Sequence, residues 1–414
     1  MESLRENLRI DGQRLWDSLM EMAKIGATPK GGVCRLALTD LDRDSRQLFT
    51  RWAEAAGCSV SHDAMGNIFA RRPGRDDSLP AVMTGSHLDS QPTGGKFDGV
   101  YGVLAGIEVL RTMNDAGIET EAPVEVVVWT NEEGSRFAPA MIGSGAYAGV
   151  FNLDYAHSRT DTEGRSLGEE LERIGYKGEG CGGRPAKAYF EAHIEQGPIL
   201  EAEEKTIGVV TAAQGQRWYE LKIVGQEAHA GPTPMARRHD ALVGASMIVT
   251  AVNRIGHDFQ PYACSTCGMI DSKPNSRNVI PGEVFLTVDL RHPEEDRLAA
   301  MDAAFRAAVD EAAKAHGLEI DVDQIWHFEA TPFDADCVSA VRGGAERAGF
   351  GHMDIVSGAG HDACYMAKVT PTGMIFVPCE NGISHNEIEN ATPEDLAAGC
   401  DVLLHAILDR AGAK

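Results

Sequence analysis

The stretch AVMTGSHLDSQPTGGKFDGVYGVLAGIEVL, residues 81–110, joins an apolar strand to an apolar helix through a glycine-rich loop. The strand ends at His87, and the loop carries Asp89 and Asp98. Open α/β sheets present ligands at the carboxyl ends of their strands, so these side chains stand where a metal ion could be held. The stretch therefore predicts an α/β fold with a metal site at this loop.

Three further apolar runs end in the same way, in polar loops that contain glycine. They are VEVVVWTNEEG (124–134), AYFEAHIEQG (188–197) and GMIFVPCENGISH (373–385). Runs of this kind are typical of buried parallel strands that lead into functional loops. We expect His193 and His385, each just beyond such a strand, to gather with His87 at one edge of the sheet.

The acidic residues of these loops suit a centre with two metal ions. Asp98 has two carboxylate oxygens, so it can bridge two ions, and the surrounding glycines let the backbone come close. The adjacent side chains of Glu132 and Glu133 diverge, so one can bind metal while the other stays free as a general base. We expect Asp89 to accept from the second ring nitrogen of His87 and fix its tautomer. Nitrogen and oxygen donors suit Zn²⁺ or Mn²⁺.

A different pattern occupies residues 213–330 and predicts an inserted domain. The expected order is strand-helix-strand-strand-helix-strand, the split βαβ arrangement. The expected elements are strand 218–224, helix 240–255, strands 262–270 and 283–291, helix 294–316 and strand 318–328. Apolar strands resume afterwards. We therefore predict a discontinuous larger domain, residues 1–212 and 331–414, and an inserted α+β (βαββαβ) domain, residues 213–330.

Composition excludes several classes of function. The 414 residues are 43% hydrophobic, which is typical of a folded globular protein with about two or three domains. With 38 basic and 62 acidic residues the net charge is -24, so the chain repels nucleic acid and anionic membranes. The N-terminus predicts an amphipathic helix rather than a signal peptide, and no apolar run is long enough to span a membrane. We expect a cytoplasmic protein.

Other motifs carry weaker signals. The 9 cysteines are scattered through apolar or helical contexts, so we expect reduced thiols, including those of CSTC (264–267). The segment GGKF (94–97) lacks the remaining residues of a phosphate-binding loop. The segment GRSLG (164–168) matches a serine-hydrolase pattern, but Ser166 and Glu169 fit a helix capping box better.

Seven motifs together resemble a known family. They are GSHLDSQPTGGKFDGVYGVLAG, TNEEGSRF, EAHIEQGP, AHAGPTPM, NVIPGEVFLTVDLR, GAGHDA and ISHNEIE. In this order and spacing they look like the dinuclear metal amidohydrolases of the M20 peptidase superfamily. They are most similar to its carbamoylase branch: N-carbamoyl-L-amino acid amidohydrolase, β-ureidopropionase and allantoate amidohydrolase. The resemblance implies a zinc-peptidase-like catalytic domain, with the insertion as a lid and dimerisation domain.

The resemblance also implies a ligand set. Asp98 would bridge two divalent ions, Zn²⁺ in the first place, with Mn²⁺, Ni²⁺ or Co²⁺ as alternatives. His87 and His193 would complete the ligands of one ion, and Glu133 and His385 those of the other.

For catalysis the resemblance implies that Glu132 is the base. His229 and Asn278 would donate to the carbonyl under attack, and the planar guanidinium of Arg291 would bind a substrate carboxylate at two points. The implied substrate contacts are Gln196, His229, Asn278, Arg291, Gly360 and His361.

The expected activity is metal-dependent hydrolysis of the ureido C–N bond of an N-carbamoyl-L-amino acid, giving amino acid, ammonia and carbon dioxide. The resemblance implies a homodimer. β-Ureidopropionase and allantoate amidohydrolase activities remain alternatives. An M20 dipeptidase or aminoacylase is less favoured, because His193 replaces an acidic ligand and GAGHDA is present. Glu132 argues against a metal-binding protein without catalysis.

Overall fold

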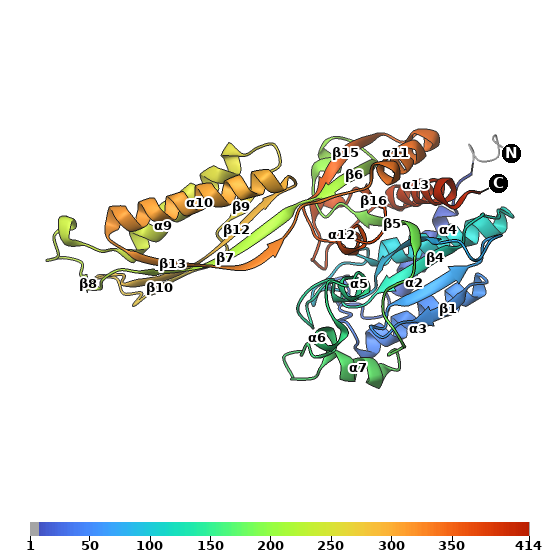
Figure 1. Cartoon of the computed structure of the whole chain (residues 1–414), viewed down its shortest axis with the longest axis horizontal. Helices are drawn as coiled ribbons and strands as arrows, with labels where there is room; N and C mark the ends of the chain where they lie inside the picture. Colours follow the sequence, from blue (N-terminus) through green and yellow to red (C-terminus); the bar gives the residue numbers. More distant parts are fainter. Residues whose placement is uncertain (1–7, 414) are drawn as a thin grey trace. The chain divides into compact units, whose positions relative to one another are not determined.

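The computed structural model describes residues 8–413, which form two compact units (Figure 1). Unit 1 contains the described residues up to Thr211 and those from Phe333 onward, and unit 2 is Ala212–Pro332. Helices alternate with strands, some of them parallel, in unit 1, so the predicted α/β class is confirmed. Residues 1–7 of the predicted N-terminal helix lie outside the described residues, and its described part is α2 (Gly12–Met22).

Unit 1 is built on a 9-stranded sheet within the described part of the chain, whose edge strand β14 and the last residues of β6 fall inside the bounds of unit 2. The strand order is β1-β2-β4-β3-β5-β16-β6-β14, and β15 pairs with β6. The bounds are β1 (Ser59–His62), β2 (Ile68–Arg72), β3 (Ala81–His87), β4 (Val124–Trp129), β5 (Ala186–Ile194), β6 (Ile207–Ala213), β14 (Thr331–Pro332), β15 (His352–Ser357) and β16 (Thr372–Val377).

Four neighbouring strands of this sheet, β4, β3, β5 and β16, run parallel. They are the four apolar runs of the sequence, and β3, β4 and β16 are buried along their whole length. Strands covered on both faces need apolar side chains on both, which explains runs without polar alternation. Because the strands are parallel, their carboxyl ends meet at one edge of the sheet. The four polar loops therefore open on the same side.

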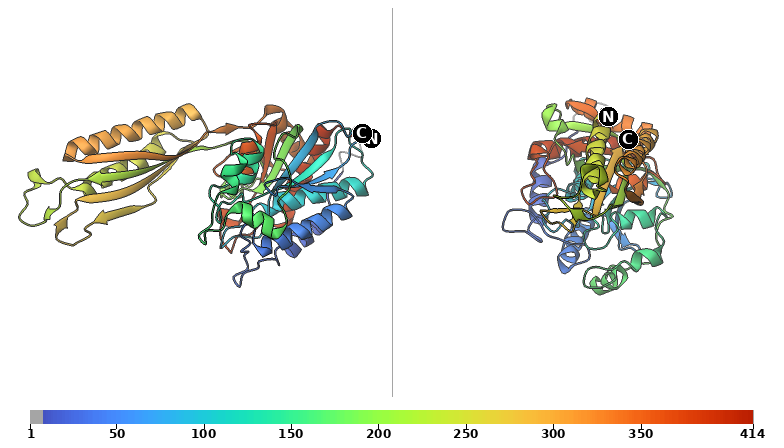
Figure 2. Two further views of the ribbon diagram at one scale, coloured as in Figure 1. Left: turned by 60° about the horizontal axis from the view of Figure 1, so that its bottom comes forward. Right: turned by 90° about the vertical axis from the view of Figure 1, so that its left-hand side faces the viewer.

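The helices of unit 1 come from both ends of the chain. They are α2, α3 (Asp40–Ala55), α4 (Val100–Asp115), α5 (Ile142–Tyr147), α6 (Leu153–His157), α7 (Leu167–Ile174), α8 (Ile199–Ala202), α11 (Ala335–Ala348), α12 (Asp362–Met366), η2 (Glu380–Gly382) and α13 (Pro393–Ala411). Helix α13 packs against α2 and α4, so the blue and red ends of the chain meet in one unit (Figure 2). As predicted, Thr392 caps α13, with Pro393 at its first position.

Unit 2 is a 5-stranded sheet with two helices. The strand order is β10-β12-β7-β13, with β9 also on β12. The bounds are β7 (Gly215–Val224), η1 (Met235–Arg237), α9 (Ala241–Asp258), β9 (Cys264–Thr266), β10 (Ile270–Lys273), β12 (Glu283–His292), α10 (Glu295–His316) and β13 (Glu319–Phe328). Two short strands, β8 (Ala228–His229) and β11 (Val279–Ile280), form a separate pair.

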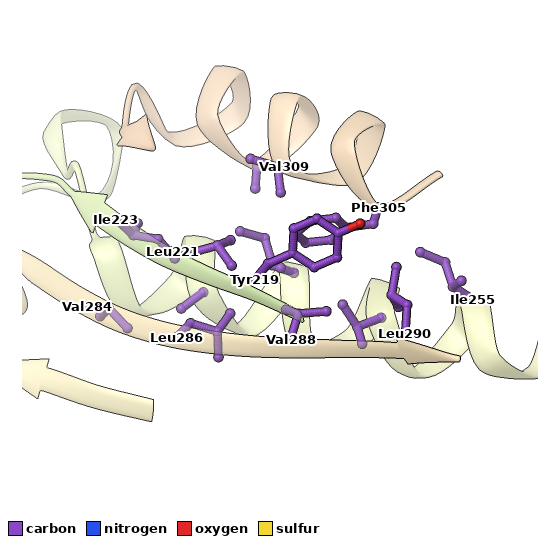
Figure 3. Packing of buried hydrophobic residues seen from close by; sticks show 14 of the residues in the cluster. Tyr219, Leu221, Ile223, Ile255, Val284, Leu286, Val288, Leu290, Phe305 and Val309 are labelled. Atoms are coloured by element: carbon purple, nitrogen blue, oxygen red, sulfur yellow. The ribbon is translucent and has the colours of Figure 1, made fainter. Parts of the chain in front are cut away.

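One face of the unit 2 sheet packs against α9 and α10 (Figure 3). Alternate residues of β12 are buried, from Val284 to Leu290, as the period of a half-buried strand requires. They pack with Tyr219 of β7 and Phe305 of α10 in a single apolar cluster. Burying one such aliphatic side chain stabilises the fold by about 1.5–3 kcal/mol. The other face of the sheet is left to polar and aromatic side chains, among them Arg291.

The segment 262–270, predicted as one strand, is two. Thr266 of β9 pairs with Asp289 of β12, and Ile270 of β10 pairs with Leu286. The four residue steps from Thr266 to Ile270 thus lie opposite only three steps on β12, from Asp289 to Leu286. The segment between β9 and β10 therefore contains one extra residue, and a bulge interrupts the pairing. The alternation of apolar and polar residues, from which the strand was predicted, does not reveal such an extra residue.

Candidate metal centre

The carboxyl edge of the four parallel strands gathers the predicted metal ligands. His87 is the last residue of β3, Glu132 and Glu133 follow β4, and His385 follows β16 and η2. His193 was predicted just beyond its strand, but it lies inside β5. Pairing between β5 and β16 continues to Ile194, so the strand includes the histidine.

Three buried donors form what we call the His87 group: His87, Asp98 and His193. Asp98 Oδ1 lies 3.2 Å from His193 Nε2 and 3.6 Å from His87 Nε2. His193 Nδ1 lies 2.9 Å from the carbonyl of Ile194, and the Gly99 N–H donates to Nε2 at 3.2 Å. A carbonyl can only accept, so Nδ1 carries a proton, and Nε2 is the ring nitrogen that faces Asp98.

The tautomer of His87 is fixed by the backbone of Asp89, which corrects the prediction for that residue. His87 Nδ1 donates to the main-chain carbonyl of Asp89 at 2.9 Å, whereas the Asp89 carboxylate is 4.0 Å away. That carboxylate instead accepts the N–H groups of Glu132 and Glu133, both at 3.2 Å. Burial lowers the pKa of His87 to about 4, so the ring is neutral at pH 7 and Nε2 is free to bind an ion.

A second set of donors, the His385 group, contains Asp98, Glu133 and His385. His385 Nε2 lies 3.3 Å from Asp98 Oδ2 and 3.4 Å from Glu133 Oε2. Gln91 orients Glu133 with its main-chain N–H at 3.1 Å and its side-chain amide at 2.7 Å. The two oxygens of Asp98 thus face different groups, as a bridging ligand requires.

The donor separations fit divalent metal ions. Two ligands about 2.1 Å from a tetrahedral ion lie about 3.4 Å apart. The measured pairs fall between 3.2 and 3.6 Å, and the donor atoms of each group all lie within 4.8 Å of one another. Imidazole nitrogens and carboxylate oxygens are the donors that Zn²⁺ and Mn²⁺ accept.

The charges of the site also favour bound metal ions. Within residues 8–413, the ion pairs of Asp98, Glu132 and Glu133 are with histidines, none with Lys or Arg. Burial and the charge of Asp98 raise the pKa of Glu133 well above its usual range. Burial also opposes ionisation of Asp98, but hydrogen bonds to histidines outweigh it and hold the pKa of Asp98 well below its usual range. Cations would offset this crowding of buried acids.

Glu132 stands beside the His87 group without belonging to it. Its side chain is 11% exposed, and Oε2 lies 3.4 Å from His87 Nε2. Burial and the nearby charges of Asp362 and Glu133 raise the pKa of Glu132 well above its usual range. The side chains of Glu132 and Glu133 diverge as expected, one toward each donor group.

Three predicted substrate contacts belong to unit 1. His361 is buried with its ring edge against His193, at 4.6 Å between centroids, and Ser357 Oγ lies 3.0 Å from its Nε2. Gly360 precedes it and is exposed. Gln196 donates to Asp98 Oδ2 at 3.0 Å, so it contacts a predicted metal ligand as well as lying near the site.

Sequence reasoning missed three residues that hold the predicted ligands: Gln91, Ser384 and Glu389. Glu389 lies in the ISHNEIE motif, two residues after Glu387, which pairs with Lys30, and no local pattern distinguishes the two. Only the packed structure shows that Glu389 is buried against the backbone of Asp98.

The remaining predicted residues belong to unit 2. His229 of β8 pairs with Val279 of β11, and the Ala230 N–H donates to the carbonyl of Asn278 at 2.9 Å, so His229 and Asn278 are neighbours. Arg291 lies on β12, where its Nε and Nη2 donate to Asp289 Oδ2 at 3.0 and 2.8 Å.

Unit 2 does not bring Arg291 together with His229 and Asn278. Arg291 stands eight positions after Glu283 on β12, which at roughly 3.3 Å per residue is about 26 Å. The pair β8 and β11 continues beyond the Glu283 end of that strand, where the Gly225 N–H donates to Gly282. The two sets therefore lie at opposite ends of the unit, and β8 is seen at one end in Figure 1.

Comparison with known families decides what kind of protein carries this centre. The sequence profile described as "Peptidase family M20/M25/M40" matches residues 83–409. The chain belongs to the M20 peptidase family.

Relatives of this M20 chain are enzymes named for amide hydrolysis. The "N-carbamoyl-L-amino-acid amidohydrolase" of Rhizobium meliloti is 53% identical, covering 98% of each sequence. The "Allantoate amidohydrolase" of Escherichia coli is 35% identical, covering 94% of this chain and 96% of the relative. A crystal structure of an "Amidase, hydantoinase/carbamoylase family" from Burkholderia multivorans is 66% identical, with a TM-score of 0.95 over 98% of each chain.

Competing motifs have ordinary structural roles in the M20 chain. Ser166 caps α7 and Glu169 returns the capping bond, so the GRSLG segment is a helix start, as predicted. All the cysteines are free, which confirms the expectation of reduced thiols. Among the described residues, no helix is long and apolar enough to cross a membrane.

Proposed function

We propose that this M20 chain hydrolyses the ureido C–N bond of N-carbamoyl-L-amino acids to the amino acid, ammonia and carbon dioxide. The observation that carries the proposal is the 53% identity, over 98% of both sequences, to the Rhizobium meliloti enzyme of that name. The geometry supports it, because Asp98 divides its oxygens between two donor groups while Glu132 stands beside them.

We propose two divalent ions per subunit, one in each donor group, with Zn²⁺ best suited and Mn²⁺, Ni²⁺ or Co²⁺ as alternatives. When bound, such ions polarise the carbonyl and acidify the water that attacks it. A ureido carbonyl needs this help, because two nitrogens donate electrons into it and make it a poor electrophile.

Glu132 is the proposed base. Its carboxylate takes a proton from the attacking water and passes it to the nitrogen that leaves as the C–N bond breaks. His361, held through its ring nitrogen by Ser357, stands against His193 and is placed to bind the substrate.

Unit 2 supplies the proposed contacts to the rest of the substrate. The Arg291 guanidinium binds the carboxylate at two points, and it must exchange its bonds to Asp289 for this. His229 and Asn278 donate to the carbonyl oxygen as it becomes an oxyanion. We assign residues 213–330 to a lid and dimerisation domain, and residues 1–212 and 331–414 to the catalytic domain.

We further propose that two copies complete one site in a homodimer formed through unit 2. The supporting observation is the separation of about 26 Å or more between Arg291 and the pair His229 and Asn278, which exceeds the length of a small substrate. Mixing inactive Arg291→Ala and His229→Ala subunits should restore about a quarter of wild-type activity, because half of the dimers contain one intact site. If the mixture is as inactive as each variant alone, this arrangement is wrong.

The decisive test is a substrate panel. Metal-free protein is reconstituted with Zn²⁺, Mn²⁺, Ni²⁺ or Co²⁺ and given N-carbamoyl-L-amino acids, 3-ureidopropionate, allantoate and dipeptides. We expect ammonia from the carbamoyl α-amino acids and no activity in the chelated protein. Faster turnover of allantoate would favour the second candidate, which the 35% identity to the Escherichia coli enzyme supports. Amine release from dipeptides alone would contradict both.

A further inference from the structure

Glu389 is a buried carboxylate to which neither the family resemblance nor the catalytic proposal gives a role. The residue is 1% exposed, and no ion pair with Lys or Arg is found for it within residues 8–413. Oε1 accepts the N–H groups of Phe97 at 3.0 Å and Asp98 at 3.1 Å, and Oε2 accepts the hydroxyl of Ser384 at 2.8 Å. A buried carboxylate without a cation is costly, so a function is expected of it.

The loop before α4 is built around this carboxylate. A Cβ at Gly95 would lie 2.0 Å from Glu389 Cδ, so only glycine lets the loop approach this closely. Gly99, the cap residue of α4, has no side chain to accept the first N–H groups of the helix. Glu389, 291 residues further along the chain than Asp98, instead accepts the N–H groups of Phe97 and Asp98, which precede the cap residue, and thereby fixes the backbone of Asp98.

Ser384 links Glu389 to the metal-facing side of Asp98. Its hydroxyl has one proton and two acceptors: Glu389 Oε2 at 2.8 Å and Asp98 Oδ2 at 3.2 Å. The shorter bond goes to Glu389. Asp98 Oδ2 already accepts the amide of Gln196 at 3.0 Å and lies 3.3 Å from His385 Nε2. As long as the Ser384 hydroxyl donates its hydrogen bond to Glu389, Asp98 Oδ2 keeps a lone pair for the His385 group.

We propose that Glu389 is a positioning residue that sets the metal affinity of the His385 group, by fixing the Asp98 backbone and by drawing the Ser384 proton away from Asp98 Oδ2. The inference rests on the metal-centre part of the proposed function.

The variant Glu389→Gln separates this role from simple packing. Its amide oxygen can still accept the backbone N–H groups, so the loop keeps its support. Its amide nitrogen donates to Ser384, which then turns its proton to Asp98 Oδ2. That oxygen gains a second donor and becomes a poorer ligand. Changes of this kind beside a ligand lower metal affinity by roughly 10–100-fold.

The experiment titrates Zn²⁺ into the full-length metal-free protein against a chromophoric chelator. Wild type should bind two ions per chain, and Glu389→Gln should bind one tightly and the other roughly 10–100-fold more weakly. The matched control is Glu387→Gln, in the same loop, whose carboxylate lies 3.4 Å from Lys30 and has no contact with Asp98 among those described. It should keep both affinities.

A second substitution tests the proton itself. The double variant Ser384→Ala/Glu389→Gln lacks the serine hydroxyl, so Asp98 Oδ2 loses the extra donor. The weak site should therefore bind Zn²⁺ more tightly than it does in Glu389→Gln. A purely structural role predicts further loss instead. Wild-type affinities in Glu389→Gln, or no recovery in the double variant, would overturn the role of Glu389. Absence of ion binding by wild type would overturn the metal centre itself, so the two failures are distinguishable.

Discussion

Gly99→Ala should disable the His87 group by steric displacement alone. Gly99 has φ +66°, and a Cβ there would lie 2.3 Å from Cε1 and Nε2 of the His87 ring. Ordinary contact begins at about 3.4 Å, so the ring must move by about 1.1 Å. A misplacement of about 1 Å in a catalytic centre costs about 100-fold in rate. We therefore expect kcat to fall at least about 100-fold and one of two Zn²⁺ affinities to drop.

The backbone of Gly99 contributes separately, and a second glycine of the same helix region measures that part. An alanine at positive φ costs about 1 kcal/mol of stability. Gly117, just past the other end of α4, has φ +62° and nothing within 4 Å of an added Cβ. Gly117→Ala should lose stability through its positive φ alone and retain activity and both ions.

Three measurements read out the comparison: thermal unfolding of the metal-free proteins, Zn²⁺ titration, and ammonia release from a carbamoyl amino acid. If Gly99→Ala binds two ions and turns over like wild type, the His87 ring is not held where the structure places it. If Gly117→Ala loses activity equally, the loss comes from the helix backbone and the steric argument fails.

Three further predictions concern single side chains. Glu132→Gln should lower kcat by about 10²–10⁴-fold with Zn²⁺ binding retained, measured by steady-state kinetics and metal titration; a rate within tenfold of wild type would remove Glu132 as base. Arg291→Lys should raise KM for carbamoyl amino acids by roughly tenfold or more while leaving carboxylate-free ureides unaffected, since a lysine lacks the planar two-point match; equal effects on both substrates would contradict carboxylate binding. Burial, with the charges of Arg347 and Arg9, lowers the pKa of His405 to about 4, so the folded chain binds this proton less readily than the unfolded chain. Stability must then fall as pH drops from about 6.5 to about 4, by roughly 3 kcal/mol at most, and urea unfolding of His405→Gln across that range should show a correspondingly flatter profile.

Local sequence patterns determined much of the fold. The apolar runs predicted β3, β4, β5 and β16, because strands covered on both faces favour apolar side chains on both. Capping residues predicted the starts of α7 and α13, since a cap bonds to an N–H only three residues away. The same runs placed His87, Glu132, Glu133, His193 and His385 near one sheet edge, where the structure brings them together. That they bind metal stays a prediction.

The sequence by itself determined which residues form strands and helices and which chemistry the loops carry, because those signals act between neighbours in the chain. Tertiary structure decided that the backbone of Asp89, rather than its carboxylate, orients His87, and that the segment 262–270 carries a bulge. It also decided that Glu389, from the far end of the chain, accepts the N–H group of Asp98. Such contacts depend on where packed elements place atoms to within an ångström, and no local spacing encodes that.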